Sequence, residues 1–130
     1  MIIIEFMEET MDSTEFAEQF KEIFKLAISW VRIAHREGLL ALEEFADKEK
    51  ISERDIFQLG VRLTIDGTDA SFIDKVLTNI INLETDQNVK ILKTIQKEAV
   101  LGILGGMNLY SFALLLNSYV DNGITVSLED

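Results

Sequence analysis

The sequence contains no cysteine, no proline and only 7 glycines among its 130 residues. Without cysteine, neither a disulfide framework nor a thiolate metal site can form. Sandwiches and barrels of many short strands need frequent turn residues, so the scarcity of glycine and proline disfavours these folds. With 48% hydrophobic residues, the chain can bury the core of one domain. We therefore expect a single all-α domain.

Basic residues are also scarce, with 12 Lys and Arg against 23 Asp and Glu, which gives a formal net charge of −11. Nucleic-acid binding depends on the neutralisation of phosphates by basic side chains. DNA, RNA and anionic membrane surfaces are therefore poor partners. The acidic residues are dense in residues 1–22, where Lys21 is the one basic residue. Such runs usually form a solvated helix face, and a docking surface for a basic partner is the alternative.

One long segment, residues 99–120, carries no charge and is long enough to span a bilayer. However, Gly105, Gly106 and Asn108 interrupt it, and lipid tolerates such polar and flexible positions poorly. Two buried helices joined by a turn are the favoured interpretation, and a transmembrane helix is the alternative. The start of the chain lacks the basic segment and long apolar core of a secretion signal, so we expect a cytoplasmic protein.

The first third of the chain shows the period of one long helix. Asp12 and Glu15 have the spacing of a capping box, so the helix should begin near Ser13. Apolar residues then recur at intervals of three and four as far as Phe45, which places Gly38 inside the helix and suggests close packing of another helix there. The apolar positions are Phe16, Phe20, Ile23, Phe24, Ala27, Trp30, Val31, Ala34, Leu39, Leu40, Leu42 and Phe45.

Further helices follow, each with start and stop signals. A cap at residues 52–55 should open a helix that Asp66 and Gly67 end, and Thr68 or Asp69 should cap the next one. That helix either breaks at the polar patch of residues 84–88 or continues through it to residues 105–106.

The end of the chain should contain one more helix, residues 109–120, and a tail. The tail, residues 124–130, is either irregular or one short strand. It and the apolar residues 1–4 either pair as a small ribbon or pack on the helices. The expected fold is a bundle of four or five helices with a long first helix. We divide it into an acidic, aromatic arm (residues 1–24), a core (residues 25–120) and a tail (residues 121–130).

Two stretches share a pattern in which a basic, an acidic and a small residue open an apolar helical turn. Residues 36–43 read Arg-Glu-Gly-Leu-Leu-Ala-Leu-Glu, and residues 97–104 read Lys-Glu-Ala-Val-Leu-Gly-Ile-Leu. The first stretch, with Gly60 and the later Asp66-Gly67 step, resembles the cytoplasmic region of the flagellar stator protein MotA family. The second stretch is similar to a later cytoplasmic element of that family but matches less well, with Leu109 where the family has proline.

The resemblance covers about residues 25–120 and implies a cytoplasmic bundle without the family's transmembrane helices. Because ion conduction needs spanning helices with polar groups facing a protected interior, we expect no ion transport. The resemblance places the charges that contact the rotor switch protein on His35 and Glu43. His35 replaces the family's arginine, and a neutral imidazole would make this contact weaker and pH-dependent. The candidate partner-binding residues are Arg32, His35, Arg36, Glu37, Glu43 and Glu44.

Other interpretations of these residues are less favoured. His35 lacks a second strong ligand for a metal site, and Glu43 and Glu44 lie among charged neighbours typical of open solvent rather than a catalytic cleft. We therefore expect no catalytic residue, no metal and no cofactor. The aromatic stripe of Phe16, Phe20 and Phe24 is a candidate oligomer face, if it finds no partner inside the domain.

The sequence thus predicts a non-enzymatic protein-interaction domain. The resemblance implies an adaptor or regulator at the flagellar motor, on the inner face of the membrane, with the rotor switch protein or a MotA-type stator as its partner. The alternative is a self-associating helical subunit of a larger assembly. A small-ligand-binding or catalytic domain is the least favoured, because it requires a deep pocket with paired polar groups.

Overall fold

The computed structural model describes residues 10–45 and 55–129. These residues form five α-helices and two short 3-10 helices, and they contain no strand. The elements are α2 (Ser13–Glu37), η1 (Leu39–Phe45), α3 (Ile56–Ile65), α4 (Ala70–Ile81), α5 (Gln87–Leu104), α6 (Leu109–Asn117) and η2 (Asn122–Ile124). The prediction of an all-α bundle with a long first helix is confirmed.

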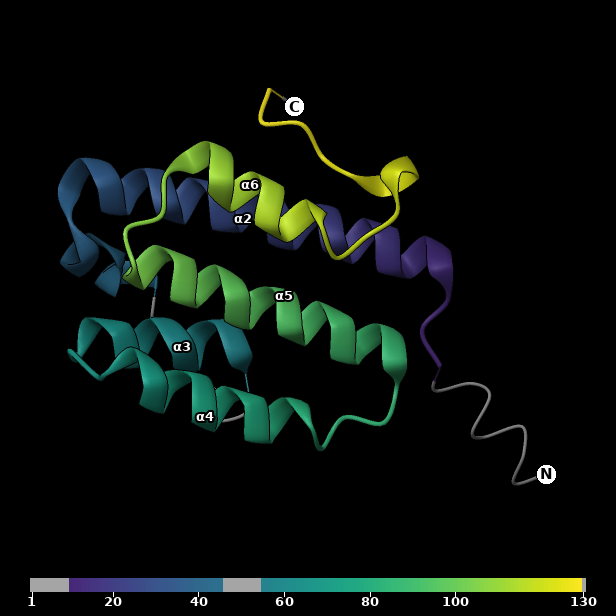
Figure 1. Ribbon diagram of the computed structural model, residues 1–130, viewed down its shortest axis with the longest axis horizontal. Helices are drawn as coiled ribbons and strands as arrows, with labels where there is room; N and C mark the ends of the chain where they lie inside the picture. Colours follow the sequence, from purple (N-terminus) through teal and green to yellow (C-terminus); the bar gives the residue numbers. More distant parts are fainter. Residues whose placement is uncertain (1–9, 46–54, 130) are drawn as a thin grey trace.

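Helix α5 is the centre of the bundle. It packs against α2 and α6 on one side and against α3 and α4 on the other (Figure 1). Its buried residues Leu92, Ile95, Ala99, Val100 and Ile103 therefore meet apolar side chains from both sides. One continuous core results, since the buried residues of all five α-helices belong to a single cluster.

The beginning of α2 is where the capping signal predicts it. The Asp12 carboxylate accepts a hydrogen bond from the backbone N–H of Glu15 at 2.9 Å. This bond satisfies one of the amide groups that the first turn of a helix leaves without a partner.

The prediction that this helix continues through Gly38 to Phe45 was wrong. Gly38 has φ 91° and ends α2, with its N–H donating to the carbonyl of Ala34 at 2.9 Å. Glycine adopts this positive φ without steric cost, and the chain turns into η1. No atom lies within 4 Å of the position of a Cβ on Gly38, so the expected close packing of a helix there is absent.

The turn between α3 and α4 follows its sequence signals. Asp55, the last residue of the predicted cap, accepts from the N–H of Gln58 at 2.9 Å and so caps α3. The other residues of that cap, 52–54, lie outside the described residues. Gly67 has φ 79° and follows the last turn of α3. Asp69, one of the two candidate caps, accepts from the N–H of Ser71 at 3.1 Å and opens α4.

Helices α4 and α5 are separate, which decides between the two alternatives for this part of the chain. Asp86 accepts from the N–H groups of Asn88 at 2.9 Å and Val89 at 3.2 Å, and so caps α5. The other oxygen of the same carboxylate accepts from the N–H of Met11 at 2.6 Å. Asp86 therefore joins the start of α5 to the start of α2, and these bonds lower its pKa, that from Met11 most strongly.

The uncharged residues 99–120 form two helical pieces joined by a turn, as the favoured interpretation predicted. The second piece is only partly buried, since Tyr110 and Leu114 are 74% and 60% exposed. α5 ends at Leu104, Gly106 turns the chain with φ 70°, and Asn108 caps α6 by accepting from the N–H of Ser111 at 2.9 Å. Among the residues that the structure describes, no helix is both long and apolar enough to cross a membrane. The helix ends at Asn117 rather than residue 120. The alternative in which the tail pairs with residues 1–4 involves residues outside the described ones.

The aromatic stripe of α2 is part of the core. Phe16, Phe20 and Phe24 are all buried within this one chain, because α5 and α6 pack against α2. The hypothesis that these three residues form an exposed oligomer face was therefore wrong. Residues 13–24 are likewise not a protruding arm but the first half of a helix packed in the bundle, while residues 1–9 lie outside the described residues.

Two ion pairs connect α4 and its following loop to α5. The Lys97 ammonium lies 2.8 Å from the Asp74 carboxylate, and the Lys93 ammonium lies 3.0 Å from the Glu84 carboxylate. The hydrogen bond from Lys97 lowers the pKa of Asp74, and that from Lys93 lowers the pKa of Glu84. Burial of Lys97 opposes its charged form, but Asp74 raises the pKa of Lys97 overall.

These shifts predict that acid destabilises the fold. A carboxylate whose pKa is lowered by folding stabilises the native state above its unfolded pKa, near 3.8 for Asp74 and 4.5 for Glu84, and this contribution disappears as the pH falls through the lower folded pKa. We expect each pair to contribute about 1 kcal/mol or less. Urea unfolding at pH 7 and pH 3 measures the loss, and the double variant D74N/E84Q should show a smaller loss than the wild type. An equal loss in both proteins would contradict the assignment.

Candidate functional site

The six candidate partner-binding residues lie at one end of the bundle. The last turns of α2 carry Arg32, His35, Arg36 and Glu37, and η1 carries Glu43 and Glu44. The turn at Gly38 brings these two elements into contact. All six side chains are exposed, so the structure collects on one surface the residues that the sequence singled out.

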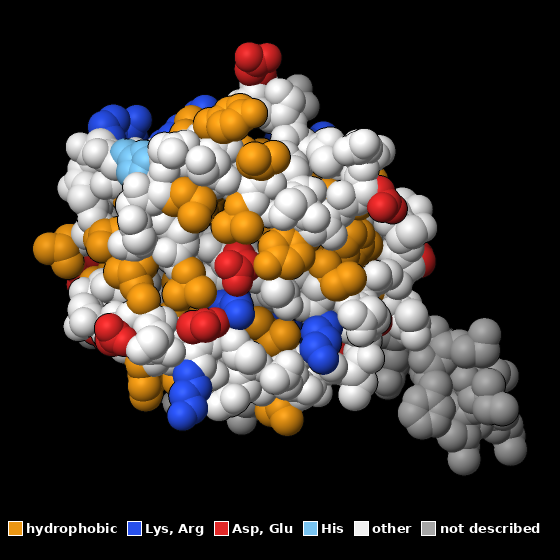
Figure 2. Space-filling view, viewed as in Figure 1, with side chains coloured by type: hydrophobic (Ala, Val, Ile, Leu, Met, Phe, Trp, Pro, Cys, Tyr) orange, Lys and Arg blue, Asp and Glu red, His pale blue; other side chains and the backbone are white. Residues whose placement is uncertain are grey.

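The basic members of this set share one face of α2. His35 and Arg36 follow Arg32 by three and four positions, and residues with this spacing are neighbours on a helix surface. Figure 2 shows histidine together with Lys or Arg side chains at the upper left of the molecule. The Arg36 guanidinium lies 3.4 Å from the Glu37 carboxylate with both side chains exposed. An ion pair this exposed contributes little to folding, so both groups are available to a partner.

The acidic members surround a shallow hollow of about 480 Å³ beside this basic face. It is lined by Glu37, Leu40, Ala41, Glu43 and Glu44, and Leu40 is 69% exposed. Three carboxylates around an exposed leucine would suit a Lys or Arg side chain, whose methylene groups cover apolar surface while the charged end meets the acids. The surface therefore offers positive and negative charge side by side, which we refer to as the charged end of the bundle.

The histidine and the acids that the sequence singled out lie on an open surface. Within residues 10–45 and 55–129, no group of three or more His, Asp and Glu side chains is placed to hold a metal ion. His35, Glu43 and Glu44 are exposed rather than enclosed in a cleft, where an acid or base for catalysis would usually lie.

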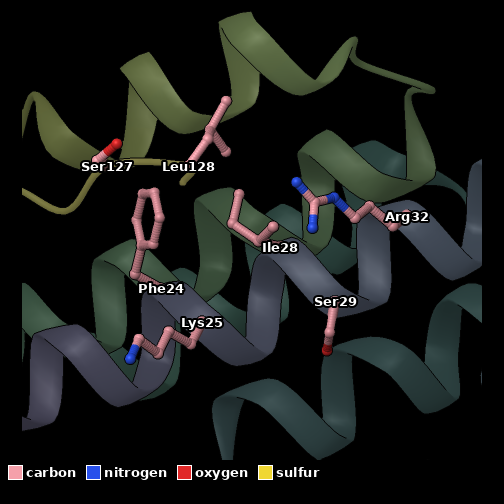
Figure 3. A pocket seen from close by; sticks show the side chains of 7 residues that line it. All are labelled: Phe24, Lys25, Ile28, Ser29, Arg32, Ser127 and Leu128. Carbon is pink, nitrogen blue, oxygen red and sulfur yellow. The ribbon is translucent and has the colours of Figure 1, made fainter. Parts of the chain in front are cut away.

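The sequence interpretation missed a second surface, between α2 and the end of the chain. Figure 3 shows Phe24, Ile28 and Arg32 extending from α2 toward Ser127 and Leu128 of the tail. These residues line a hollow of about 190 Å³. The alternation of apolar and polar residues after position 123 was the available signal, but alternation alone does not tell where a tail packs.

Comparison with known proteins adds no relative: no protein-family model, curated protein or solved structure matches this chain. The similarity to the MotA family therefore rests on the short motifs in the sequence. The surface of the charged end has to be interpreted from its own chemistry.

Proposed function

We propose that this chain is a non-enzymatic protein-interaction domain that acts as an adaptor or regulator at the bacterial flagellar motor, on the cytoplasmic side of the membrane. Its partner in this proposal is the rotor switch protein or a MotA-type stator. The charged end of the bundle makes the contact. The domain conducts no ions and performs no catalysis.

The observation that carries the proposal is the exposure of all six candidate residues on two touching elements, α2 and η1. Side chains that hold a fold together are buried or paired, whereas these contribute little to it. Charged surfaces of both signs are suited to steering and orienting a protein partner. The resemblance of residues 36–43 to the MotA family supports the choice of partner.

The position of Glu43 gives a direct test. Reversing its charge in the E43K variant places a cation in the acidic hollow, and opposed like charges at an interface cost up to several kcal/mol. We expect the affinity for the purified rotor switch protein to fall about tenfold or more, measured by light scattering and by pull-down. E22K is a matched control, because Glu22 is an exposed acid on α2 that does not line this hollow. Equal binding by the wild type and E43K would remove Glu43 from the interface.

A self-associating subunit is the second candidate function, and one observation favours it. On α6, Tyr110 and Leu114 are 74% and 60% exposed and one helical turn apart, so they form an apolar strip suited to a second copy. Light scattering on the chain alone distinguishes the two functions. A large homo-oligomer that binds neither motor protein would support self-assembly, and a heavier mixed complex would support the adaptor.

A further inference from the structure

The last residues of the chain are held by a side chain that pairs with the backbone. After η2, the Asn117 side-chain nitrogen donates to the carbonyl of Val126, and the backbone N–H of Val126 donates to the Asn117 side-chain oxygen, both at 2.9 Å. An amide side chain that supplies one donor and one acceptor to the same residue imitates the pairing of a neighbouring strand. Asn117 thus holds the tail by the backbone of Val126, whatever side chain that residue carries.

The side chains of this tail alternate between buried and exposed. Val126 is 8% exposed and Leu128 is partly buried against the core, whereas Thr125, Ser127 and Glu129 are exposed. Thr125 is extended and residues 125–127 form no turn, whereas residues 128–129 form a turn. The alternation directs the side chains of Val126 and Leu128 toward the protein. The tail therefore lies across α2 and α6 in the manner of a bound peptide, in which backbone hydrogen bonds give affinity and alternate side chains give specificity.

The tail leaves hollows on both sides of the surface between α2 and α6 on which it lies, and we refer to this surface as its seat. Toward α2 it leaves the hollow of about 190 Å³ in Figure 3 and another of about 310 Å³ around Ala17, Lys21 and Val126. Toward α6 it leaves one of about 380 Å³, lined by Tyr110, Leu114 and Leu128 among others. These hollows are open at the surface and partly lined by apolar side chains, so a segment with larger side chains would bury more apolar surface here.

We propose that the seat between α2 and α6 is a peptide-binding groove, occupied in the isolated chain by residues 125–129 and open to an extended segment of a partner protein. The partner segment has apolar side chains at alternate positions, of which the second is larger than leucine, and an acidic residue after it. Arg32 supplies the matching charge, since its guanidinium lies beside Ile28 (Figure 3) and lines the same hollow as Leu128, and Arg favours carboxylate partners.

In this proposal the tail competes with the partner segment for the groove and so inhibits binding of the partner. It is linked to α6 through the short η2 segment, so its effective concentration at the groove is about millimolar. While the tail occupies the groove, a competing peptide cannot bind. The apparent affinity for that peptide is therefore its intrinsic affinity multiplied by the fraction of chains in which the groove is open. The groove shares Arg32 with the charged end and Tyr110 and Leu114 with the apolar strip of α6. The proposal nevertheless does not depend on the motor, because it is tested with a synthetic peptide.

The test uses a fluorescent peptide, Thr-Val-Ser-Leu-Glu-Asp, which reproduces residues 125–130, and the full-length chain. In the V126D/L128D variant the tail no longer fits and the groove is intact. We expect this variant to bind the peptide about tenfold or more tightly than the wild type, with fluorescence anisotropy as the measurement. Adding N117L should abolish the gain, and a peptide with phenylalanine in place of leucine should bind more tightly than the original.

If V126D/L128D keeps the circular dichroism and thermal unfolding of the wild type but binds the peptide no better, the proposal is overturned. If that variant fails to fold, NMR on the wild-type chain decides. The phenylalanine peptide, added well above the millimolar effective concentration of the tail, should shift the Asn117 side-chain amide and the Val126 backbone amide signals. Signals that do not move would equally overturn the proposal.

Discussion

Replacing Phe20 by alanine is expected to lower the free energy of unfolding by about 3–5 kcal/mol, which is the usual cost of removing a buried phenylalanine. Phe20 is 0% exposed, and its ring centroid lies 6.0 Å from that of Phe24. The variant would leave a cavity in the core beneath α2. Because such a loss is a large part of the stability of a domain this size, urea unfolding should show a midpoint far below that of the wild type.

The matched control is L26A on the same helix. Leu26 is 41% exposed, so its truncation removes less buried surface and should cost about 1 kcal/mol or less. The comparison also tests the correction of the oligomer face. If the aromatic stripe contacted a second copy, F20A would reduce the mass in solution and leave the monomer as stable as before. Equal unfolding midpoints for F20A and the wild type would show that Phe20 is not in the core.

Helix starts were the part of the fold that the sequence predicted best, because they depend on short-range chemistry. Asp12, Asp55 and Asp69 each accept a hydrogen bond from a backbone N–H two or three residues later, and such caps depend only on the local geometry of side chain and backbone. The turn at Gly67 is local in the same way, since its positive φ suits glycine at a helix end.

The break at Gly38 could not be predicted from the apolar pattern. Leu42 of η1 is fully buried, as is Val31 of α2, so the spacing of apolar residues stays helical although the element changes. Periodicity reports which residues face the core but not whether the backbone between them is continuous. The same limit explains why the aromatic stripe looked unpartnered, because the side chains that cover it come from α5 and α6, far along the chain.

The candidate surfaces differ in how far the sequence could locate them. The residues of the charged end are nearly contiguous in sequence, so a motif sufficed to group them. The groove depends on pairing between Asn117 and Val126. Neither residue carries a signal for the other, since an asparagine at the end of a leucine-rich helix is equally typical of a simple helix end.

The close helix approach that the sequence assigned to Gly38 occurs at Gly60. A Cβ at this position would lie 2.7 Å from one methyl group of Val100 and 2.9 Å from the other. Helices α3 and α5 therefore approach this closely because Gly60 has no side chain. Val100 is 1% exposed, and a β-branched side chain in a helix has one strongly preferred rotamer. Its methyl groups therefore cannot move aside at low cost.

We expect the G60V variant to be about 3 kcal/mol less stable than the wild type, at the upper end of the usual cost of overpacking. G123V is the control, since no atom lies within 4 Å of a Cβ at Gly123, and its unfolding midpoint should stay close to that of the wild type. Combining G60V with V100A removes the obstructing methyl groups, so the double variant should be more stable than the sum of the two single changes predicts. Additive losses in this cycle would mean that Val100 does not limit the space at Gly60, and that the approach of α3 to α5 is less close than the structure has it.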